Sequence, residues 1–479
     1  MFGNENDASR RQFLQALGIG VAGMWGSELL ATTPAPLDEH HQPTHTCDPP
    51  AHGAASSFIR DCRPIRPRQI ADRLTPAEVT QLKAAYKAMR DLDTSDPNDP
   101  RGFRQQANVH CFFCATSDPS IQVHGTWKFF AWHRAYLYFH ERILGKLIGN
   151  ENFRLPFWGW DSTAFHKLPV PYVTPNDATN PLFNPTRALA PGTPLPDSDV
   201  GSATIPVIAD VLSLATFAEF GGTASTSGVP EGSPHGSVHV DVGGDMGFFD
   251  TAGRDPIFYQ HHGTVDKLWS DWNRAAATHT NPADPAFLNL TFNFFDENKV
   301  WRSIKASQVL DHENSLRYVY EPYRFWDIFR CFRWRPVAIG WRTTQRITLP
   351  PANRDLGLAL RGDGPVRLHF REIQFPRDRT AVYDIYVSQE EAQAARGAES
   401  PGWLASVGIV LNDRENKHPV RGTANVIASV RPQLRARLMR GDTLQPYFVE
   451  RSQRPASRSA LPVRAADVFF SVGEMDRER

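Results

Sequence analysis

Six of the chain's seventeen histidines fall into two groups of three, and this pattern restricts the possible folds more than any other feature of the sequence. The six are His110, His124 and His133 in the first group, and His235, His239 and His262 in the second. Three neutral imidazoles without an obligatory carboxylate or thiolate suit zinc, copper, iron or nickel. Any one of them alone could be a buried core histidine. Together they predict two metal sites that form one dinuclear centre.

The stretch 255–272 is predicted to carry the last of these histidines on a helix. Asp255 is a good N-cap and Pro256 suits the first helical position. Phe258, His262 and Asp266 follow at intervals of four residues, so they share one helical face. A histidine between an aromatic ring and a carboxylate fits a metal ligand with its supporting residues.

Spacing also places four of the other histidines. His124 and His133 are nine residues apart and would face opposite ways on one helix. We therefore expect His124 in a loop or first turn, and His133 inside the apolar helix predicted at 128–148. His235 and His239 are four residues apart and share one helical face.

Length and charge exclude several classes of protein. The chain has 479 residues and 41% hydrophobic content, enough for more than one domain. Its 52 basic residues balance 52 acidic residues, which argues against nucleic acid or a membrane surface as a partner. No apolar run reaches the roughly 18 residues that a membrane span requires.

The N-terminus resembles an export signal. Arg10 and Arg11 lie in the sequence SRRQFL, and a weakly apolar stretch follows. This is typical of twin-arginine signals, although a disordered basic tail would look similar. We predict a signal peptide at 1–35, a bacterial source, the twin-arginine machinery as a partner, and a periplasmic or secreted protein. Export permits disulfides among the five cysteines.

The remaining sequence divides into a helical and a β-rich part. Helical patterns dominate 36–325, and short β-rich runs bounded by Gly, Pro, Asn or Asp fill 351–479. We therefore predict a mainly α domain, a linker at 326–350, and a C-terminal all-β sandwich. A helix is also expected from Thr75 to about Met89, and a short one at about 205–220.

Several motifs resemble the type-3 copper motifs of polyphenol oxidases, the tyrosinase and catechol oxidase family. They are HCFFC, VHGTWKFFAWHR, PHGSVHV, DMGFFDTAGRDPIFYQHH and VDKLW, and the likeness is greatest to the plant-type branch. RYVY and VYDIYVS extend the resemblance over nearly the whole chain. It implies a four-helix-bundle core with two copper ions, copper A on the first histidine group and copper B on the second. His261 is then a neighbour and not a ligand.

The resemblance also implies roles for the cysteines. Cys114 matches the cysteine that forms a thioether with the second copper A ligand, here His124, although an ordinary buried cysteine is the alternative. Where the family usually has a pair of adjacent cysteines, this chain has Asp61-Cys62. We predict a Cys47–Cys62 disulfide, and leave the pairing of the two other cysteines, Cys111 and Cys331, open.

The implied activity is the oxidation of o-diphenols to o-quinones with O2. Phe249 holds the position of the family's gate residue, or else is plain core packing. Glu231 matches a glutamate that positions a water to deprotonate monophenols, but Gly236 replaces the asparagine expected to help it. We therefore predict a diphenolase with weak monophenolase activity. Asp266 is expected behind the site, orienting a ligand or an arginine.

Three alternatives remain at this point. The first is a tyrosinase with full monophenol hydroxylase activity, and the second a haemocyanin-like O2 carrier. A dinuclear zinc hydrolase is disfavoured because such sites normally use bridging carboxylates. The C-terminal domain is predicted to keep the enzyme latent until a protease cuts within about 325–350. The loop expected around Trp403-Leu404 is the candidate for the blocking segment.

Overall fold

The computed structural model describes residues 47–321, apart from positions 62, 64, 117 and 202–206, and parts of the C-terminal region. Those parts are 332–341, 360, 366–373, 380–395, 400–410, 424–440, 446–452 and 467–475. All of them belong to one compact unit that begins at Pro43. The predicted signal at 1–35, Cys62 and Cys331 lie outside the described residues.

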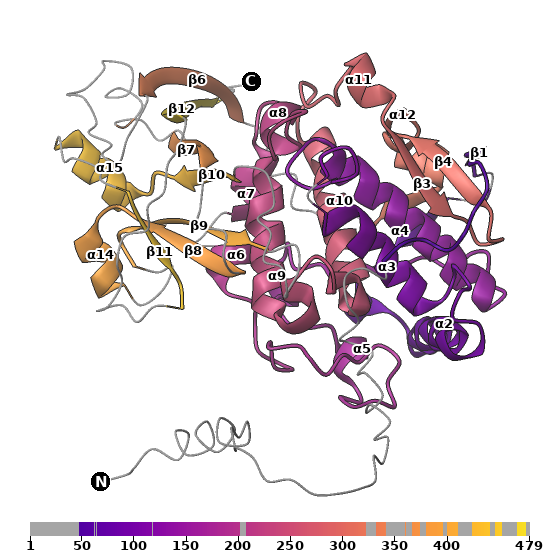
Figure 1. Ribbon diagram of the computed structural model, residues 1–479. Coiled ribbons are helices and arrows are strands. Elements are labelled where there is room, and N and C mark those ends of the chain that lie inside the picture. Colours follow the sequence, from indigo (N-terminus) through magenta and orange to yellow (C-terminus); the bar gives the residue numbers. More distant parts are fainter. Residues whose placement is uncertain are drawn as a thin grey trace, which may run out of the picture. The chain divides into compact units, whose positions relative to one another are not determined.

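Four long helices form the core of the helical part (Figure 1). They are α2 (Pro76–Ser95), α3 (Phe103–Cys114), α4 (Lys128–Leu147) and α10 (Ile257–Ala275). Both α4 and α10 are buried on nearly every face. In α4 this follows from apolar residues nearly all round, whereas α10 also buries charged residues such as Asp266 and Lys267, which form ion pairs. The predicted four-helix core is confirmed, and the helix expected at 128–148 is α4.

Local sequence explains where two of these helices begin. Thr75 and Glu78 form a reciprocal capping box at the start of α2, and the helix runs beyond the predicted end to Ser95. Asp255 caps the start of α10, as predicted. Its backbone is extended, Pro256 already has helical angles, and the Asp255 carboxylate accepts the Ile257 N–H at 2.9 Å. The same carboxylate also pairs with Arg187 at 2.6 Å.

Short helices and turns surround this core. The single helix expected at 205–220 is two helices, α7 (Val207–Leu212) and α8 (Phe217–Phe220), because Thr216 caps a new start. The second histidine group lies on the turn η4 (Glu231–Gly236) and on α9 (Ser237–Val242). The others are η2 (Ala71–Arg73), η3 (Thr163–Phe165), α5 (Val170–Val173), α6 (Asp197–Val200), η5 (Gly244–Gly247), η6 (Ala252–Arg254), α11 (Pro285–Leu288), α12 (Ala306–Val309) and η7 (His312–Leu316).

Two small sheets attach the N-terminal arm to the end of the helical part. Strands β3 (Thr291–Phe295) and β4 (Trp301–Lys305) are antiparallel, and β1 (Ser56–Ser57) pairs with β4 in parallel. Strand β2 (Arg66–Arg68) pairs in parallel with β5 (Tyr318–Tyr320). No helix in the described part of the chain is long and apolar enough to span a membrane.

The C-terminal part consists of two antiparallel sheets that share a core. One has the order β10-β7-β12-β6 and the other β11-β8-β9. The strands are β6 (Phe332–Trp341), β7 (Val366–Ile373), β8 (Ala381–Tyr386), β9 (Trp403–Ile409), β10 (Ala424–Ser429), β11 (Tyr447–Glu450) and β12 (Asp467–Met475). Buried residues of both sheets, such as Leu368 and Ile385, belong to one apolar cluster. The predicted sandwich is confirmed, with two added helices, α14 (Gln389–Ala394) and α15 (Pro432–Met439).

The predicted linker needs a correction. Its residues 332–341 form β6, which pairs with β12 at the edge of the four-stranded sheet. The segment contains two arginines, Arg333 and Arg335, and Pro336, and such residues are typical of an edge strand. The C-terminal sheet structure therefore begins before 351.

Candidate metal centre

The first histidine group comes together from two helices and the loop between them. His110 lies on α3, His133 lies on α4, and His124 lies in the loop just before α4, as predicted. Each side chain is buried, and their ligand atoms lie within 4.8 Å of one another and of the Cys114 Sγ. Residues separated by 23 positions therefore form one potential metal site.

The second group comes from the turn η4 and the helices α9 and α10. His235, His239 and His262 are buried, and their ligand atoms also lie within 4.8 Å of one another. The two groups are in contact. The His133 and His262 rings stack at 4.2 Å between centroids and 7° between planes. The sequence-predicted residues thus form one centre with two adjacent sites.

Backbone carbonyls fix four of the six imidazoles. Their Nδ1 atoms lie 2.7–2.8 Å from main-chain oxygens, so each Nδ1–H donates and each Nε2 keeps its lone pair. The pairs are His110 with Phe249 O, His133 with Phe129 O, His235 with Glu231 O, and His239 with Met246 O. Such bonds set the tautomer and orientation of a metal-binding histidine.

The Nε2 atoms point to an interior that contains no protein partner for them. In the described chain, the Nε2 atoms of His110, His124, His133 and His235 are buried and have no hydrogen-bond partner. Burial lowers the pKa of His133 to about 3 and that of His239 to about 4, so the rings stay neutral at ordinary pH. Neutral imidazole lone pairs that converge without donors fit a cation such as copper.

His261 also lies close to the second group, but a hydrogen bond argues against its being a ligand. The Trp160 indole N–H donates to His261 Nδ1 at 3.0 Å. In a neutral imidazole the proton is then on Nε2, which leaves no lone pair for a metal. This supports the assignment of His262 as the ligand of the pair. Trp160 was missed by the sequence reasoning, since nothing in WGWD links it to residue 261.

Cys114 is buried and is not part of a disulfide. Burial raises the pKa of its thiol well above the ordinary value. Both ring nitrogens of the neighbouring His124 lack a hydrogen-bond partner. His124 is therefore the one member of the first group that no carbonyl orients, and it shares its site with this thiol.

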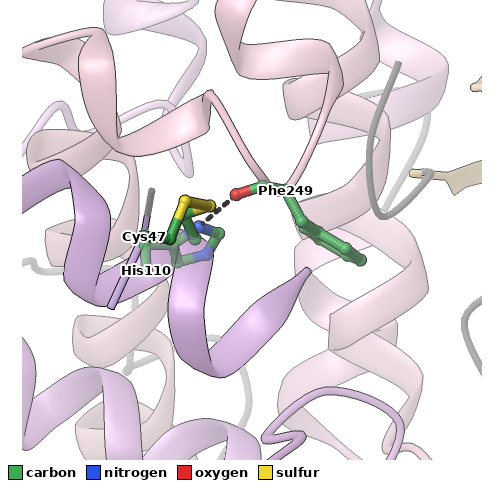
Figure 2. Close-up of a disulfide and its surroundings, with 4 residues drawn as sticks. Cys47, His110 and Phe249 are labelled. Carbon is green, nitrogen blue, oxygen red and sulfur yellow. Dashed lines mark hydrogen bonds between the residues drawn. A yellow bond between two sulfur atoms is a disulfide. The ribbon is translucent and has the colours of Figure 1, made fainter. Parts of the chain in front are cut away.

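The predicted Cys47–Cys62 disulfide is wrong, because Cys47 is bonded to Cys111. Figure 2 shows this disulfide beside His110, whose ring bonds to the Phe249 carbonyl. The bridge ties the N-terminal arm to α3 at the residue that follows His110. The sequence carries no local signal for this pairing, because the two cysteines are 64 positions apart.

Glu231 is half-buried and lies at the boundary of the two groups. One carboxylate oxygen accepts the Gly125 N–H at 2.6 Å, and the other, Oε2, is buried without a partner. Burial raises the pKa of Glu231 to about 8. The residue therefore connects the loop of His124 to the turn that carries His235.

Phe249 and Phe258 pack against the histidines. The Phe249 ring stacks on His124 at 4.1 Å and 23°. Phe258 lies between His110 and His262, with ring centroids 4.6 and 4.3 Å away. Phe249 thus contacts two histidines of the first group: its ring stacks on His124, and its carbonyl accepts a hydrogen bond from His110.

Asp266 contacts arginine and tyrosine side chains. It accepts hydrogen bonds from Arg134 and Tyr318 at 2.5 Å each, and from Tyr320. These charges lower the pKa of the buried carboxylate despite its burial. Of the two predicted roles for Asp266, the geometry matches orientation of an arginine, and none of its hydrogen bonds reaches a histidine of the centre.

Comparison with protein families identifies two domains in the chain. The common central domain of tyrosinase matches residues 100–204 and 172–275, and the polyphenol oxidase middle domain matches residues 281–327. All six histidines lie within the two ranges that match the tyrosinase domain.

Two plant proteins are among the most similar curated relatives. The chain is 34% identical over 360 residues to the latent form of polyphenol oxidase of Prunus armeniaca, which covers 64% of this chain and 59% of that protein. It is 30% identical over 414 residues to polyphenol oxidase B of Solanum lycopersicum, covering 74% and 68%. Both are named chloroplastic. The chain thus spans about three fifths to two thirds of the length of these relatives.

A solved structure resembles both parts of the chain. Recombinantly expressed latent aurone synthase (polyphenol oxidase) superposes with a TM-score of 0.68 at 25% identity, covering 88% of this chain and 94% of that one. The similarity thus extends from the helical part into the C-terminal sheets.

Proposed function

The chain belongs to the plant-type polyphenol oxidase family, and from this membership we propose that it is a latent dicopper enzyme that oxidises o-diphenols to o-quinones with O2. One observation carries the proposal: four buried Nε2 atoms converge and have no hydrogen-bond partner in the described part of the chain. In the reaction, two diphenol molecules lose four electrons and four protons, and one O2 becomes two waters.

The six histidines would hold the metal, copper A by His110, His124 and His133, and copper B by His235, His239 and His262. When bound, the copper pair supplies two electrons at a time for the reduction of O2. The residues keep this site dry and oriented. Phe249 and Phe258 exclude water from the imidazole faces, and carbonyls hold four of the rings.

We propose that Cys114 Sγ forms a thioether with a ring carbon of His124, with O2, the oxidant of the proposed reaction, accepting the two electrons and two protons that the thiol and the ring C–H lose. The support is the position of the thiol in the same site, together with the lack of a hydrogen-bond partner for the His124 ring among the described residues. A covalent bond would fix the orientation that a carbonyl provides for His110 and His133.

The preference for diphenols over monophenols follows from the absence of a polar side chain after the copper B ligands. A monophenol must lose its proton before it is hydroxylated, and Glu231 is the carboxylate available for this. In the metal-free protein, burial raises its pKa to about 8, which leaves it mostly protonated near neutral pH. Gly236 and Val240 follow His235 and His239, and neither can orient a water for Glu231.

Latency is supported by contacts of the C-terminal sheets with the segments that carry copper B. Polar contacts surround the junction: Arg451 bonds Asp199 at 2.5 Å, and Arg367 pairs with Asp210 at 2.7 Å. Activating cleavage within 325–350 would have to avoid β6, which leaves the stretches 325–331 and 342–350.

We further propose a bacterial source and export through the twin-arginine machinery, to the periplasm or outside the cell. The support is the sequence SRRQFL with Arg10 and Arg11. Residues 1–36 fused to a folded reporter should reach the periplasm of a bacterial host, while the Arg10→Lys/Arg11→Lys version should stay in the cytoplasm. Equal retention of both fusions would contradict export.

Oxygen uptake before and after limited proteolysis tests the proposed activity. We expect slow uptake with catechol before cleavage, rapid uptake afterwards, and weak uptake with tyrosine in both forms. Rapid, lag-limited turnover of tyrosine at a rate comparable to catechol would contradict the diphenol preference. Unchanged catechol oxidation after clean removal of the C-terminal part would contradict latency.

A further inference from the structure

Strand β9 of the C-terminal part lies against the turn that carries His235, and two glycines meet at this contact. Gly236 directly follows His235 at the end of η4, and Gly408 lies near the end of β9. A Cβ atom built on Gly408 would lie 2.2 Å from the carbonyl carbon of Gly236 and 2.3 Å from the Ser237 nitrogen. One built on Gly236 would lie 2.5 Å from the Gly408 oxygen.

These distances leave no room for any side chain, because the obstacles are backbone atoms. A flexible side chain could rotate away, whereas a main-chain atom moves only with its whole segment. The preceding position on β9 is close as well. A Cβ atom on Gly232 would lie 3.0 Å from the Val407 side chain. The two backbones therefore meet at Gly236 and Gly408, and the Val407 side chain lies against Gly232.

Neither backbone is free to move aside. Gly408 pairs with Val382 within the sheet, and its neighbour Val407 is fully buried in the C-terminal core. On the other side, the His235 ring bonds the Glu231 carbonyl, and the Glu231 carboxylate bonds the Gly125 N–H. A shift of the turn would therefore disturb the copper B ligand itself.

The polar contacts between the two parts hold them together but do not fix this spacing as strictly. Arg451 and Arg367 are long side chains that can follow small displacements of Asp199 and Asp210. At Gly236 and Gly408 the two main chains are in direct contact, and this contact allows no such displacement.

We propose that the Gly236–Gly408 contact maintains the latent state: the C-terminal part packs against the copper B turn only while both positions lack a side chain. Glycine at 236 is then required by docking of β9, and a methyl group at either position releases the inhibition. This inference rests on the proposed latency of the enzyme and names its structural determinant.

The test compares full-length Gly408→Ala and Gly236→Ala with the wild type, before and after limited proteolysis. We expect the uncut variants to oxidise catechol about tenfold faster than the uncut wild type, since overpacking of fixed backbone shifts such an equilibrium by at least this factor. Cleaved Gly408→Ala should match the cleaved wild type. Gly53→Ala is the matched control, because a Cβ there meets nothing within 4 Å.

Hydrogen exchange supplies a readout that is independent of activity. Amides at 232–237 and 403–410 should exchange faster in both variants, while amides of β7 and β10 stay protected as in the wild type. Because Gly236→Ala leaves the C-terminal sequence unchanged, release in that variant cannot come from an unfolded sandwich.

The outcomes separate the two proposals. Suppose that proteolysis activates the wild type but both uncut variants oxidise catechol as slowly as the uncut wild type. The glycine contact then does not maintain latency, and the inference is overturned. Loss of protection throughout the sandwich in Gly408→Ala, with Gly236→Ala still latent, also overturns it. A wild type that proteolysis does not activate overturns latency itself, and this inference with it.

Discussion

The two histidine groups of the centre differ in how their members are held and in what covers them. In the first group, His124 comes from a loop and no carbonyl orients its ring, while His110 and His133 are held by main-chain oxygens. In the second group every histidine comes from a helix or helical turn, and β9 packs against η4 and α9. The first site therefore has one ligand that no main-chain oxygen orients, and the second lies against a strand of the C-terminal part.

Removal of a ligand should have the largest effect, and it should act equally on the two sites. His124→Ala and His239→Ala should each lower catechol oxidation by about a thousandfold or more, since both sites must act together. Each variant should retain one bound copper, measurable by metal analysis. His140→Ala serves as a control, because this buried histidine stacks on Tyr259 and lies outside both groups. Substantial activity in His124→Ala would show that the loop ligand is dispensable.

Loss of Arg451 should weaken the packing of the C-terminal part against the second site. The guanidinium bonds Asp199 and Asp384, so Arg451→Met removes the cation that these two buried carboxylates share. Breaking such a pair costs roughly 3–5 kcal/mol, and we expect a marked rise in the activity of the uncut enzyme. Arg437→Met is the matched control, since its partner Glu391 lies within the C-terminal part. Equal latency of the Arg451 variant and the control would show that this ion pair does not hold the C-terminal part in place.

Cys114→Ser should affect the first site alone. If a thioether exists, the wild-type peptide that links Cys114 and His124 is two hydrogens lighter than the sum of its parts, and the variant lacks this linkage. We expect copper A to bind about tenfold more weakly in the variant, because supporting contacts of a ligand contribute about this much, while copper B is unaffected. A linear, unmodified Cys114 peptide from active wild-type enzyme would contradict the thioether.

Glu231→Gln should have the smallest effect of these variants. The effect is on the thermal stability of the metal-free protein, and it depends on pH. The folded-state pKa of Glu231 is raised from 4.5 to about 8, so the stability it contributes is lost as pH rises through that range. Metal-free wild type should therefore lose thermal stability relative to Glu231→Gln between about pH 5 and pH 8, in a comparison of melting temperatures. A constant difference over this range would show that Glu231 is ionised throughout.

Much of this comparison was predictable from sequence. Spacing placed His124 in a loop and His133 on the buried helix α4, and both predictions are confirmed. The repeat of four residues put Phe258 and His262 on one face, and their rings are 4.3 Å apart. Such local periodicity is sufficient because a helix converts spacing directly into direction.

What the sequence could not provide were contacts between distant segments. The Cys47–Cys111 bridge joins positions 64 apart, and the family pattern led to the wrong partner. The Trp160 bond to His261 and the Gly236–Gly408 contact depend on how separate elements pack. A single glycine produces no periodic pattern in a sequence. Gly236 could therefore be interpreted only as a replacement of the asparagine that the family resemblance led us to expect.

Copper stoichiometry measured together with oxygen uptake tests the central claim most directly. We expect two copper ions per chain in the wild type, and catechol oxidation that appears only when both sites are filled during titration of the metal-free protein. One copper per chain with full activity, or an equally active protein loaded with zinc alone, would contradict a coupled dicopper centre built on the six histidines.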